Sequence, residues 1–338
     1  MLVLSNCLSK IADEGCLKVA VNLVGRIKKA QPQTTVVTYD RESEISDVCL
    51  QVNKLLLNRR LISIIRRYRG QVLYIPFPAR TLATAIRVFI LSLFSGKGLK
   101  VISVMKYHNN FFSRLLLRLS GAEFIVFSKD AADYYKSILG GKRVTYLTTG
   151  VDTEKFVPVS AEKSSELKIK YGFDGNKPVI LHVGHLNQGR NIAELMKFDE
   201  KYQVLLVTST LTKNEQDEDL KAKLSGCSNI KLIDDYIPNI EEIYQLSDVY
   251  FFPVSEAGRC IDVPLSAMEA ASCNKPVITT DYGEMKSFLG KNGFYYIDSF
   301  ERGRLNALVE QAINARNISS REAVLGYDWN NAVSYFLN

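Results

Sequence analysis

The chain has 338 residues, of which 46% are hydrophobic and 23% charged, and its formal net charge is +7. This composition is typical of a globular protein, and the length is sufficient for two domains. Because no run of 18 apolar residues is present and the first apolar stretch is short, we expect neither a membrane-spanning helix nor a signal peptide. The six cysteines include no CxxC pair, so we expect reduced thiols in a cytoplasmic protein and no zinc site.

Short apolar runs alternate with helical stretches along the first half of the chain. The predicted strands are Leu2–Ser5, Thr35–Tyr39, Val48–Val52, Val72–Ile75, Lys100–Val104, Glu123–Phe127 and Val144–Leu147. The predicted helices are Cys16–Ala30, Lys54–Arg69, Arg80–Phe94, Asn110–Leu119 and Asp130–Leu139.

The second half repeats this alternation. Its predicted strands are Val179–Val183, Gln203–Val207, Asn229–Leu232, Val249–Phe252, Pro276–Thr280 and Phe294–Ile297. Alternation of strands and helices at this spacing indicates parallel, helix-covered sheets. We therefore predict an α/β fold with two doubly wound, Rossmann-like domains that face each other across a cleft. The polar stretch Ser160–Glu166 after Pro158 predicts the linker between them.

Positive charge is concentrated in the first half. Residues 1–155 hold 24 Lys and Arg against 11 Asp and Glu, whereas the remainder holds 19 against 25. Residues 48–122 contain 13 basic side chains and no acidic one. The Lys54–Arg69 helix would carry an apolar stripe opposite its arginines, a pattern that fits either an anionic membrane surface or a core-facing helix with a solvated basic face. Nucleic acid is a further standard partner of such charge, but the chain has no recognition motif for it.

One segment of the second half combines a buried strand, a loop and a helix start. The apolar run Val249–Pro253 predicts the strand, and Ser255–Asp262 predicts a turn-rich loop. Pro264 then opens a helix, where its missing N–H costs nothing. This layout directs free backbone N–H groups at an anionic ligand. Glu269 lies about 1.5 turns into the helix, where a carboxylate suits sugar hydroxyls beside phosphates, so the segment indicates a nucleotide site.

The segment Pro264–Val277 resembles the donor-site helix of retaining, family 4 glycosyltransferases with the GT-B fold, whose pattern is roughly Pro-Leu-x-x-Glu-Ala-Met-Ala-Cys-Gly-x-Pro-Val. Two further motifs occur in the order of that family. Val183–Asn191 resembles Val-Gly-Arg-Leu-x-x-x-Lys-Gly/Asn, and Gly150–Pro158 resembles Gly-Val-Asp-x-x-x-Phe-x-Pro. Trp329 stands where the family often has a tryptophan. The resemblance runs from about residue 125 to the end of the chain.

The resemblance implies a domain organisation. Residues 1–158 would form the acceptor-side domain, completed by a C-terminal helix at about 326–338. Residues 159–325 would form the domain that binds the nucleotide-sugar donor. It also implies retention of the anomeric configuration and no need for a metal or other cofactor. The acidic run Asp217–Asp219, which resembles a metal-binding Asp-x-Asp, is interpreted as a solvated helix face.

Arg190 stands where the family has its diphosphate-binding lysine, and a guanidinium suits phosphate. The alternative is a surface arginine at a helix start. His185, next to Gly184 in the same motif, takes the place of the family's arginine, and its alternative is a structural histidine at a strand end. The resemblance places both residues, with Gly184, at the donor.

Four residues of the donor helix are implied in binding as well: Pro264, Leu265, Ser266 and Glu269. Glu269 would accept hydrogen bonds from the ribose hydroxyls, and Ser266, with backbone N–H groups near Leu265, would hold phosphate. A plain helix cap is the alternative for Ser266.

The family usually has a second acid eight residues before the glutamate, in contact with the sugar. Here that position is Ile261, so either Asp262 or Glu256 would replace the acid, with Asp262 favoured.

In the first domain, Gly15 would be the close-approach residue of a loop before a helix, with a simple turn as the alternative. His108 follows a strand where family members often carry a histidine facing the cleft, and an exposed or core histidine is its alternative. The candidate catalytic residues are His108, Arg190 and Asp262.

The resemblance and the candidate residues together predict that the protein is a hexosyltransferase. A sugar would move from a nucleoside-diphosphate sugar to a glycan or lipid-linked acceptor, at the cytoplasmic face of the cell membrane, in polysaccharide or glycolipid biosynthesis. The basic region 48–122 would make the protein peripheral on that membrane. Two alternatives stay open: a non-catalytic partner subunit with the same fold, and a nucleotide-sugar epimerase that needs no acceptor.

Overall fold

The computed structural model describes residues 1–6, 8, 14–39, 43–68, 70–77, 80–105, 110–187, 189–210 and 216–337, and of Lys97 and Lys142 only the backbone. The chain forms two compact units. The N-terminal unit comprises Met1–Thr149, Ile261–Val263 and Trp329–Asn338, and the C-terminal unit comprises Gly150–Cys260 and Pro264–Asp328.

The N-terminal unit is built on a parallel sheet of strand order β3-β2-β1-β4-β5-β6-β7. The strands are β1 (Leu2–Ser5), β2 (Thr35–Tyr39), β3 (Val48–Leu50), β4 (Val72–Ile75), β5 (Leu99–Ser103), β6 (Glu123–Val126) and β7 (Val144–Tyr146). The central strands are buried on both faces, as expected where helices cover both sides of a parallel sheet, and the edge strands β3 and β7 are mostly half-buried.

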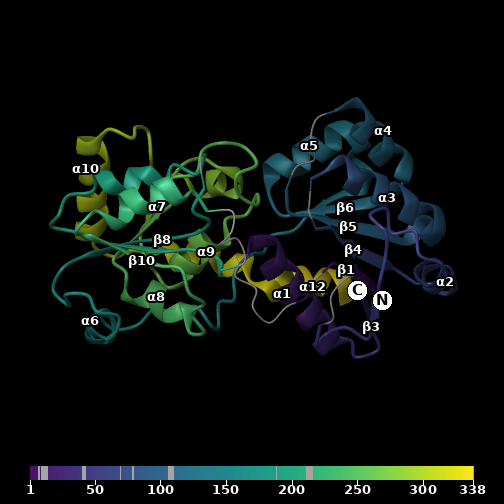
Figure 1. The fold of residues 1–338 in the computed structure, drawn as a ribbon, viewed down its shortest axis with the longest axis horizontal. Helices are drawn as coiled ribbons and strands as arrows, with labels where there is room; N and C mark the ends of the chain where they lie inside the picture. Colours follow the sequence, from purple (N-terminus) through teal and green to yellow (C-terminus); the bar gives the residue numbers. More distant parts are fainter. Residues whose placement is uncertain are drawn as a thin grey trace. The chain divides into compact units, whose positions relative to one another are not determined.

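Helices cover the two faces of this sheet. They are α1 (Gly15–Ala30), α2 (Arg59–Arg67), α3 (Leu82–Ser95), α4 (Phe111–Ser120), α5 (Lys129–Leu139) and α12 (Trp329–Leu337). The last helix, α12, packs beside the first helix, α1, although the two lie at opposite ends of the chain (Figure 1). The other four helices, α2 to α5, contribute side chains to one core cluster with the sheet.

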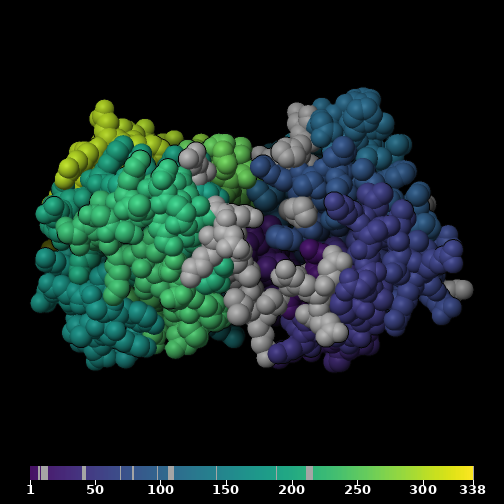
Figure 2. Space-filling model, viewed as in Figure 1, coloured from purple at the N-terminus to yellow at the C-terminus, as the bar shows by residue number. Residues whose placement is uncertain are grey.

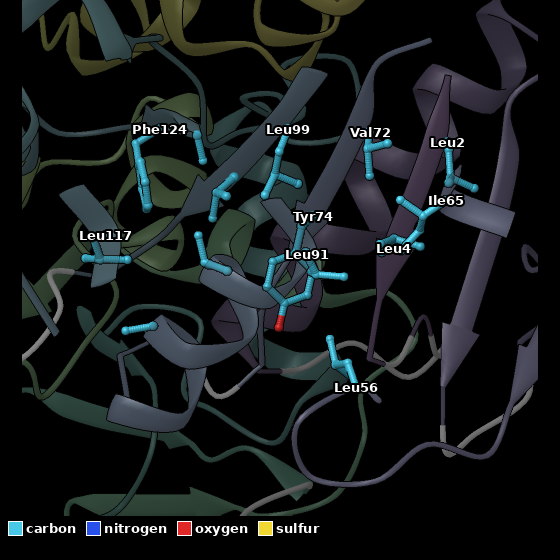
Figure 3. Close-up of a cluster of buried hydrophobic side chains, with 14 of the residues drawn as sticks. Leu2, Leu4, Leu56, Ile65, Val72, Tyr74, Leu91, Leu99, Leu117 and Phe124 are labelled. Carbon is cyan, nitrogen blue, oxygen red and sulfur yellow. The ribbon is translucent and has the colours of Figure 1, made fainter. Parts of the chain in front are cut away.

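Figure 3 shows this core cluster, in which Tyr74 of β4 lies among leucines from strands and helices. Leu61 and Ile65 of α2 belong to it and are each 1% exposed. The apolar stripe of α2 therefore faces the core, so this stripe is not available to a membrane.

The predicted start of α2 at Lys54 is wrong by five residues. Asn58 caps the helix, with its side chain accepting hydrogen bonds from the backbone N–H groups of Arg60 and Leu61. The preceding residues form a turn in which Leu56 has a φ of 60°, a conformation that cannot continue a helix.

The C-terminal unit is built on a second parallel sheet of strand order β10-β9-β8-β11-β12-β13. Its strands are β8 (Val179–Val183), β9 (Gln203–Val207), β10 (Ile230–Ile233), β11 (Val249–Phe252), β12 (Val277–Thr279) and β13 (Phe294–Tyr296). Its helices are α6 (Ala161–Lys170), α7 (Glu218–Ser225), α8 (Ile240–Leu246), α9 (Leu265–Ser272), α10 (Arg302–Asn314) and α11 (Ser320–Val324), with 3₁₀ turns at Ile192–Lys197 and Gly283–Phe288.

Helices lie on both sides of this sheet too. Figure 1 shows α7 and α10 on one side of β8 and β10, and α6 and α8 on the other. A core cluster joins α7, α10 and the turn Ile192–Lys197 to the sheet. Both units are therefore doubly wound, which confirms the predicted α/β class.

The units divide at Thr149, nine residues before the boundary at 158 that the linker composition indicates. Residues after Gly150 are bonded into the C-terminal unit. Val151 pairs with Asp328, whose carboxylate accepts hydrogen bonds from the backbone N–H and hydroxyl of Thr153. Phe156 packs edge-on against Tyr244 at 5.5 Å between ring centroids. These contacts bind the segment to the C-terminal unit.

The composition leads us to expect no membrane-spanning helix and no disulfide. Among the described residues, no helix has both the length and the hydropathy needed to cross a membrane. No disulfide joins the described cysteines, while Cys7 lies outside that part of the chain.

Candidate functional site

The order of strands in the C-terminal unit defines where a ligand would bind. The first strand, β8, lies between β9 and β11. The chain runs from β8 through β9 to β10 at one edge of the sheet, and then crosses back to β11 on the other side of β8. In open α/β sheets, ligands bind at such a switch point, outside the carboxyl ends of the strands. The loops after β8 and β11 begin at Gly184 and Pro253, and they contain or adjoin the predicted donor residues of this unit.

The loop after β8 brings three predicted features together. Gly184 follows the strand directly, and its backbone N–H donates to Val207. A side chain at this position would be crowded, because a Cβ would lie 3.0 Å from both Arg190 Nη1 and His182 Nε2. His185, the next residue, is partly exposed. The absence of a side chain at Gly184 therefore lets the Arg190 guanidinium lie against the backbone.

Arg190 is only 7% exposed, and its Nε donates to the backbone carbonyl of Arg259 at 2.8 Å. The neighbouring Asn191 amide donates to the carbonyl of Pro253 and to Ser255 Oγ, both at 2.9 Å. These three bonds join the loop after β8 to the loop after β11. Arg190 is thus a fixed cation at the switch point and not a mobile surface arginine.

Replacing Gly184 with alanine is expected to displace the Arg190 guanidinium and weaken binding of an anionic ligand by about tenfold or more, because overpacking costs about 1–3 kcal/mol. Gly303→Ala in α10 is the matched control, since a Cβ there meets nothing within 4 Å. Calorimetric titration with nucleoside diphosphates measures both. Equal affinities of the two variants would contradict the role of Gly184.

His182 was not predicted as a site residue, yet it lies beside Arg190. It is 1% exposed, its Nδ1 donates to the carbonyl of Phe251 at 2.8 Å, and its buried Nε2 lies against Gly184 without a hydrogen-bond partner. Burial, with the Arg190 charge as a smaller cause, lowers the pKa of His182 to about 4. The imidazole is therefore neutral near pH 7 and adds no charge to the site.

This lowered pKa predicts a pH dependence of stability. Between pH 6.5 and 4 the unfolded chain protonates His182 and the folded chain does not, so acidification favours unfolding. We expect the free energy of unfolding to fall by about 2 kcal/mol from pH 7 to pH 5 on this account. Urea denaturation of wild type and His182→Phe at both pH values checks it. The same loss in both proteins would contradict the assignment.

The predicted donor helix is α9, with Pro264 as its N-cap residue. Leu265 is 5% exposed, and Ser266 is the one residue of the helix that is not fully buried. The hydroxyl of Tyr250 in β11 donates to the carbonyl of Val183 at 3.2 Å and shares a hydrogen bond with Ser266 Oγ at 2.6 Å. This tyrosine joins the end of β8 to the first turn of α9, where backbone N–H groups have no partner within the helix.

Glu269 lies deeper in α9 and is 5% exposed. The hydroxyl of Tyr244 donates to Glu269 Oε2 at 2.6 Å, and both groups are buried. Burial and the Glu269 charge raise the pKa of Tyr244, so its hydroxyl stays a donor. The carboxylate is held in one orientation and not left on a solvated helix surface.

Tyr244 and Tyr250 are positioning residues that sequence reasoning missed. Their rings are neighbours, 6.0 Å apart, and each hydroxyl holds one candidate ligand residue of α9. Buried tyrosine hydroxyls usually have a partner, so a tyrosine within an apolar run could have indicated a bonded site. The identity of the partner could not be read from the sequence.

The two candidate acids lie in different surroundings. Glu256 pairs with Arg259 at 2.9 Å in the loop after β11 and adjoins Gly189. Asp262 is 8% exposed and belongs to the three-residue segment that groups with the N-terminal unit, where its backbone N–H donates to Val104. Which of them would contact a sugar stays a prediction.

The N-terminal candidates are Gly15 and His108. Gly15 is the first residue of α1, after the N-cap Glu14, and a Cβ on it would lie 3.1 Å from Ile261 Cδ1. The close approach at Gly15 is therefore made by Ile261. His108 lies outside the described residues.

No group of three or more metal-binding side chains occurs among the residues that the structure describes. Asp217, the first residue of the acidic run, is the N-cap of α7 and accepts a hydrogen bond from Leu220. The polar groups at the switch point are instead one buried guanidinium, a helix N-terminus and an oriented carboxylate. These suit an anion with hydroxyls beside it.

Comparisons with known proteins show which proteins this chain is similar to. Residues 177–314 match the family model of the glycosyl transferases group 1. The Bacillus subtilis (strain 168) protein EpsD, which carries the name of a glycosyltransferase, is 27% identical over 162 residues. That match covers 46% of this chain and 42% of EpsD, so it spans less than half the length of this relative.

Two solved structures are similar over nearly the whole chain. A glycosyltransferase from Rickettsia africae ESF-5 is 15% identical, with a TM-score of 0.76, and the alignment covers 99% of this chain and 96% of that one. Anabaena HepE, solved in complex with UDP and glucose, is 12% identical, with a TM-score of 0.77 and coverage of 99% and 98%. These likenesses confirm the predicted GT-B fold. The chain thus resembles the glycosyl transferases group 1 over residues 177–314 and shares the fold of these solved structures over nearly its whole length.

Proposed function

We propose that this protein is a glycosyltransferase that moves a hexose from a nucleoside-diphosphate sugar to a glycan or lipid-linked acceptor, with retention of anomeric configuration and without a metal. The observation that carries the proposal is the buried Arg190 guanidinium, which the carbonyl of Arg259 fixes at the switch point. Anabaena HepE, which has the same fold, was solved with UDP-glucose, and this supports a uridine nucleotide as the first donor to test.

The chemistry requires positive charge at the leaving group. When the bond between the anomeric carbon and the diphosphate oxygen breaks, the electron pair leaves with the diphosphate. Arg190 and the backbone N–H groups of Leu265 and Ser266 would stabilise that charge, and in many such reactions this stabilisation contributes most of the rate enhancement. The acceptor oxygen would form the new bond to the same carbon from the face that the diphosphate leaves, and its proton would pass to the departing diphosphate oxygen.

Glu269 would orient the nucleotide by accepting hydrogen bonds from the ribose hydroxyls. Its orientation is already set by the Tyr244 hydroxyl, so little ordering is needed on binding. Asp262 or Glu256 would contact the sugar, and His108 and Gly15 would serve the reaction from the N-terminal unit.

We further propose that the protein works at the cytoplasmic face of the cell membrane, in polysaccharide or glycolipid biosynthesis. The support is the basic region 48–122, which has 13 Lys and Arg and no acid. Anionic lipid contributes about 1 kcal/mol per basic residue near its surface.

Product analysis tests the proposed reaction. The protein is incubated with UDP-glucose alone and with UDP-glucose plus a membrane lipid extract. A transferase gives at most slow hydrolysis alone, and it gives UDP plus a glucosylated product with the extract. A new sugar nucleotide formed without any acceptor would identify an epimerase. Binding of nucleotide sugars without any product, across donors and extracts, would identify a non-catalytic subunit.

A further inference from the structure

Exposed large apolar side chains gather in one part of the N-terminal unit. Four of them lie on the single helix α4: Phe111 is 72% exposed, Phe112 66%, Leu115 41% and Leu119 61%. Three others lie on or near the neighbouring helices, namely Leu57, Leu82 and Leu93. Exposed apolar residues scattered singly are normal, but four on one short helix form a patch.

The orientation of α4 is fixed by its other side. Ser113, Leu117 and Ser120 are buried, and Leu117 belongs to the core cluster. Asn110 caps the helix by accepting a hydrogen bond from the backbone N–H of Ser113 at 2.7 Å. The outward residues are the four apolar ones and two exposed arginines; we call Phe111, Phe112, Arg114, Leu115, Arg118 and Leu119 the α4 face. A water-facing surface would carry mostly polar residues here.

The surface beside α4 is also positively charged. Helix α3 packs against α4 and α2 packs against α3, so the three helices form one layer (Figure 1). In the space-filling view of Figure 2, the blue atoms at the right of the picture belong to this part of the N-terminal unit. A shallow pocket between α2 and α3 is lined by Arg59, Arg66, Arg67 and Phe94, and the Arg66 guanidinium lies 4.8 Å from the centre of the Phe94 ring. Within residues 48–122 no acid balances these groups.

The charge and the exposed apolar side chains of the α4 face together indicate which kind of partner binds there. A second copy of this chain would place arginines against arginines with no acid between them, which costs free energy. Nucleic acid would satisfy the arginines but would leave Phe111 and Leu119 in water. An anionic lipid bilayer satisfies both, because aromatic and aliphatic side chains enter the headgroup region while arginines bind lipid phosphates.

We infer that the α4 face docks on an anionic lipid bilayer. This places membrane contact on α4 and not on α2, whose apolar stripe is in the core. The inference rests on the proposed membrane location but is independent of donor binding.

Vesicle cosedimentation tests it. Wild-type protein is mixed with phosphatidylcholine vesicles with and without phosphatidylglycerol, at low and high salt. We expect binding only with phosphatidylglycerol, weakened by salt. Phe111→Ser/Phe112→Ser should bind about tenfold or more weakly. Arg114→Gln/Arg118→Gln should also bind about tenfold or more weakly and depend less on salt than wild type, since the arginines of α2 remain.

Matched controls come from the other unit. Ile169→Ser on α6 removes an apolar side chain that is 67% exposed, and Arg316→Gln removes an exposed charge; both should bind like wild type. Because the altered α4 residues are exposed, all variants should keep the wild-type melting temperature and its shift with UDP-glucose, which separates failure of the docking surface from failure of the donor site.

Wild-type binding by the Phe111→Ser/Phe112→Ser variant, or no binding by wild type, would overturn the inference. A concentration-dependent dimer that this variant abolishes, without vesicle binding, would assign the α4 face to a second copy and would equally overturn it.

Discussion

Replacing Arg190 with alanine is expected to lower the rate of sugar transfer by about 10²–10³-fold, the usual cost of losing one group that stabilises transition-state charge. The guanidinium is 7% exposed and fixed by the carbonyl of Arg259, so its charge has a set position in the loop. Arg190→Lys should retain more activity, because a lysine keeps the charge but loses the fork geometry. Release of UDP from UDP-glucose, with an acceptor on which wild type turns over, measures the rates.

Arg259 supplies a matched control for this experiment. It is also an arginine of the same loop pair, but its side chain is partly exposed and pairs with Glu256. Arg259→Ala keeps the backbone carbonyl that binds Arg190, so its rate should stay near that of wild type. Equal loss in the two alanine variants would mean that the loop, and not the Arg190 charge, matters.

Replacing Glu269 with alanine is expected to raise the dissociation constant of a nucleoside diphosphate by about 10²-fold, since each hydrogen bond to a charged group contributes about 1.5–3 kcal/mol. A thermodynamic cycle that combines the Glu269→Ala variant with a nucleotide lacking the ribose hydroxyls isolates the contact between Glu269 and the ribose. Wild type should bind UDP much more tightly than 2′,3′-dideoxy-UDP, whereas Glu269→Ala should not distinguish them. If the variant still prefers UDP, Glu269 does not contact the ribose.

Stability is a separate effect of the same change. Loss of Glu269 leaves the buried Tyr244 hydroxyl without this acceptor, at a cost of about 1–3 kcal/mol. Glu284 provides the control, because it is 1% exposed and accepts a hydrogen bond from Tyr327 at 2.7 Å in the same unit. Glu284→Ala should lower stability similarly and leave nucleotide affinity unchanged.

Much of the fold could be predicted because most of the parallel strands consist mainly of apolar residues. Leu2–Ser5, Thr35–Tyr39 and Val179–Val183 have the predicted bounds. The start of α2 was missed because Asn58 and the positive φ of Leu56, local features that apolar periodicity does not report, decide it. The boundary at 158 was placed from composition, whereas Asp328, far along the chain, binds Thr153 into the C-terminal unit.

The candidate site, too, could be predicted only in part. Gly184, Arg190 and Glu269 are carried by motifs and could be selected from the sequence. Their surroundings could not be predicted, because the bond of Tyr244 to Glu269 spans 25 residues and that of Arg190 to Arg259 spans 69. Such contacts depend on how the loops meet at the switch point. Motifs therefore indicated the groups, and the structure shows what holds them.

The most direct test of a donor site in the C-terminal unit is a thermal-shift panel of UDP-, GDP-, CDP- and ADP-sugars on wild type and Glu269→Ala. A bound ligand at 100 times its dissociation constant adds about 2.7 kcal/mol of stability. We predict that one nucleotide class stabilises wild type and that the variant loses this shift. If no nucleotide sugar stabilises wild type at any concentration tested, the switch point of the C-terminal unit is not a donor site, and the central claim fails.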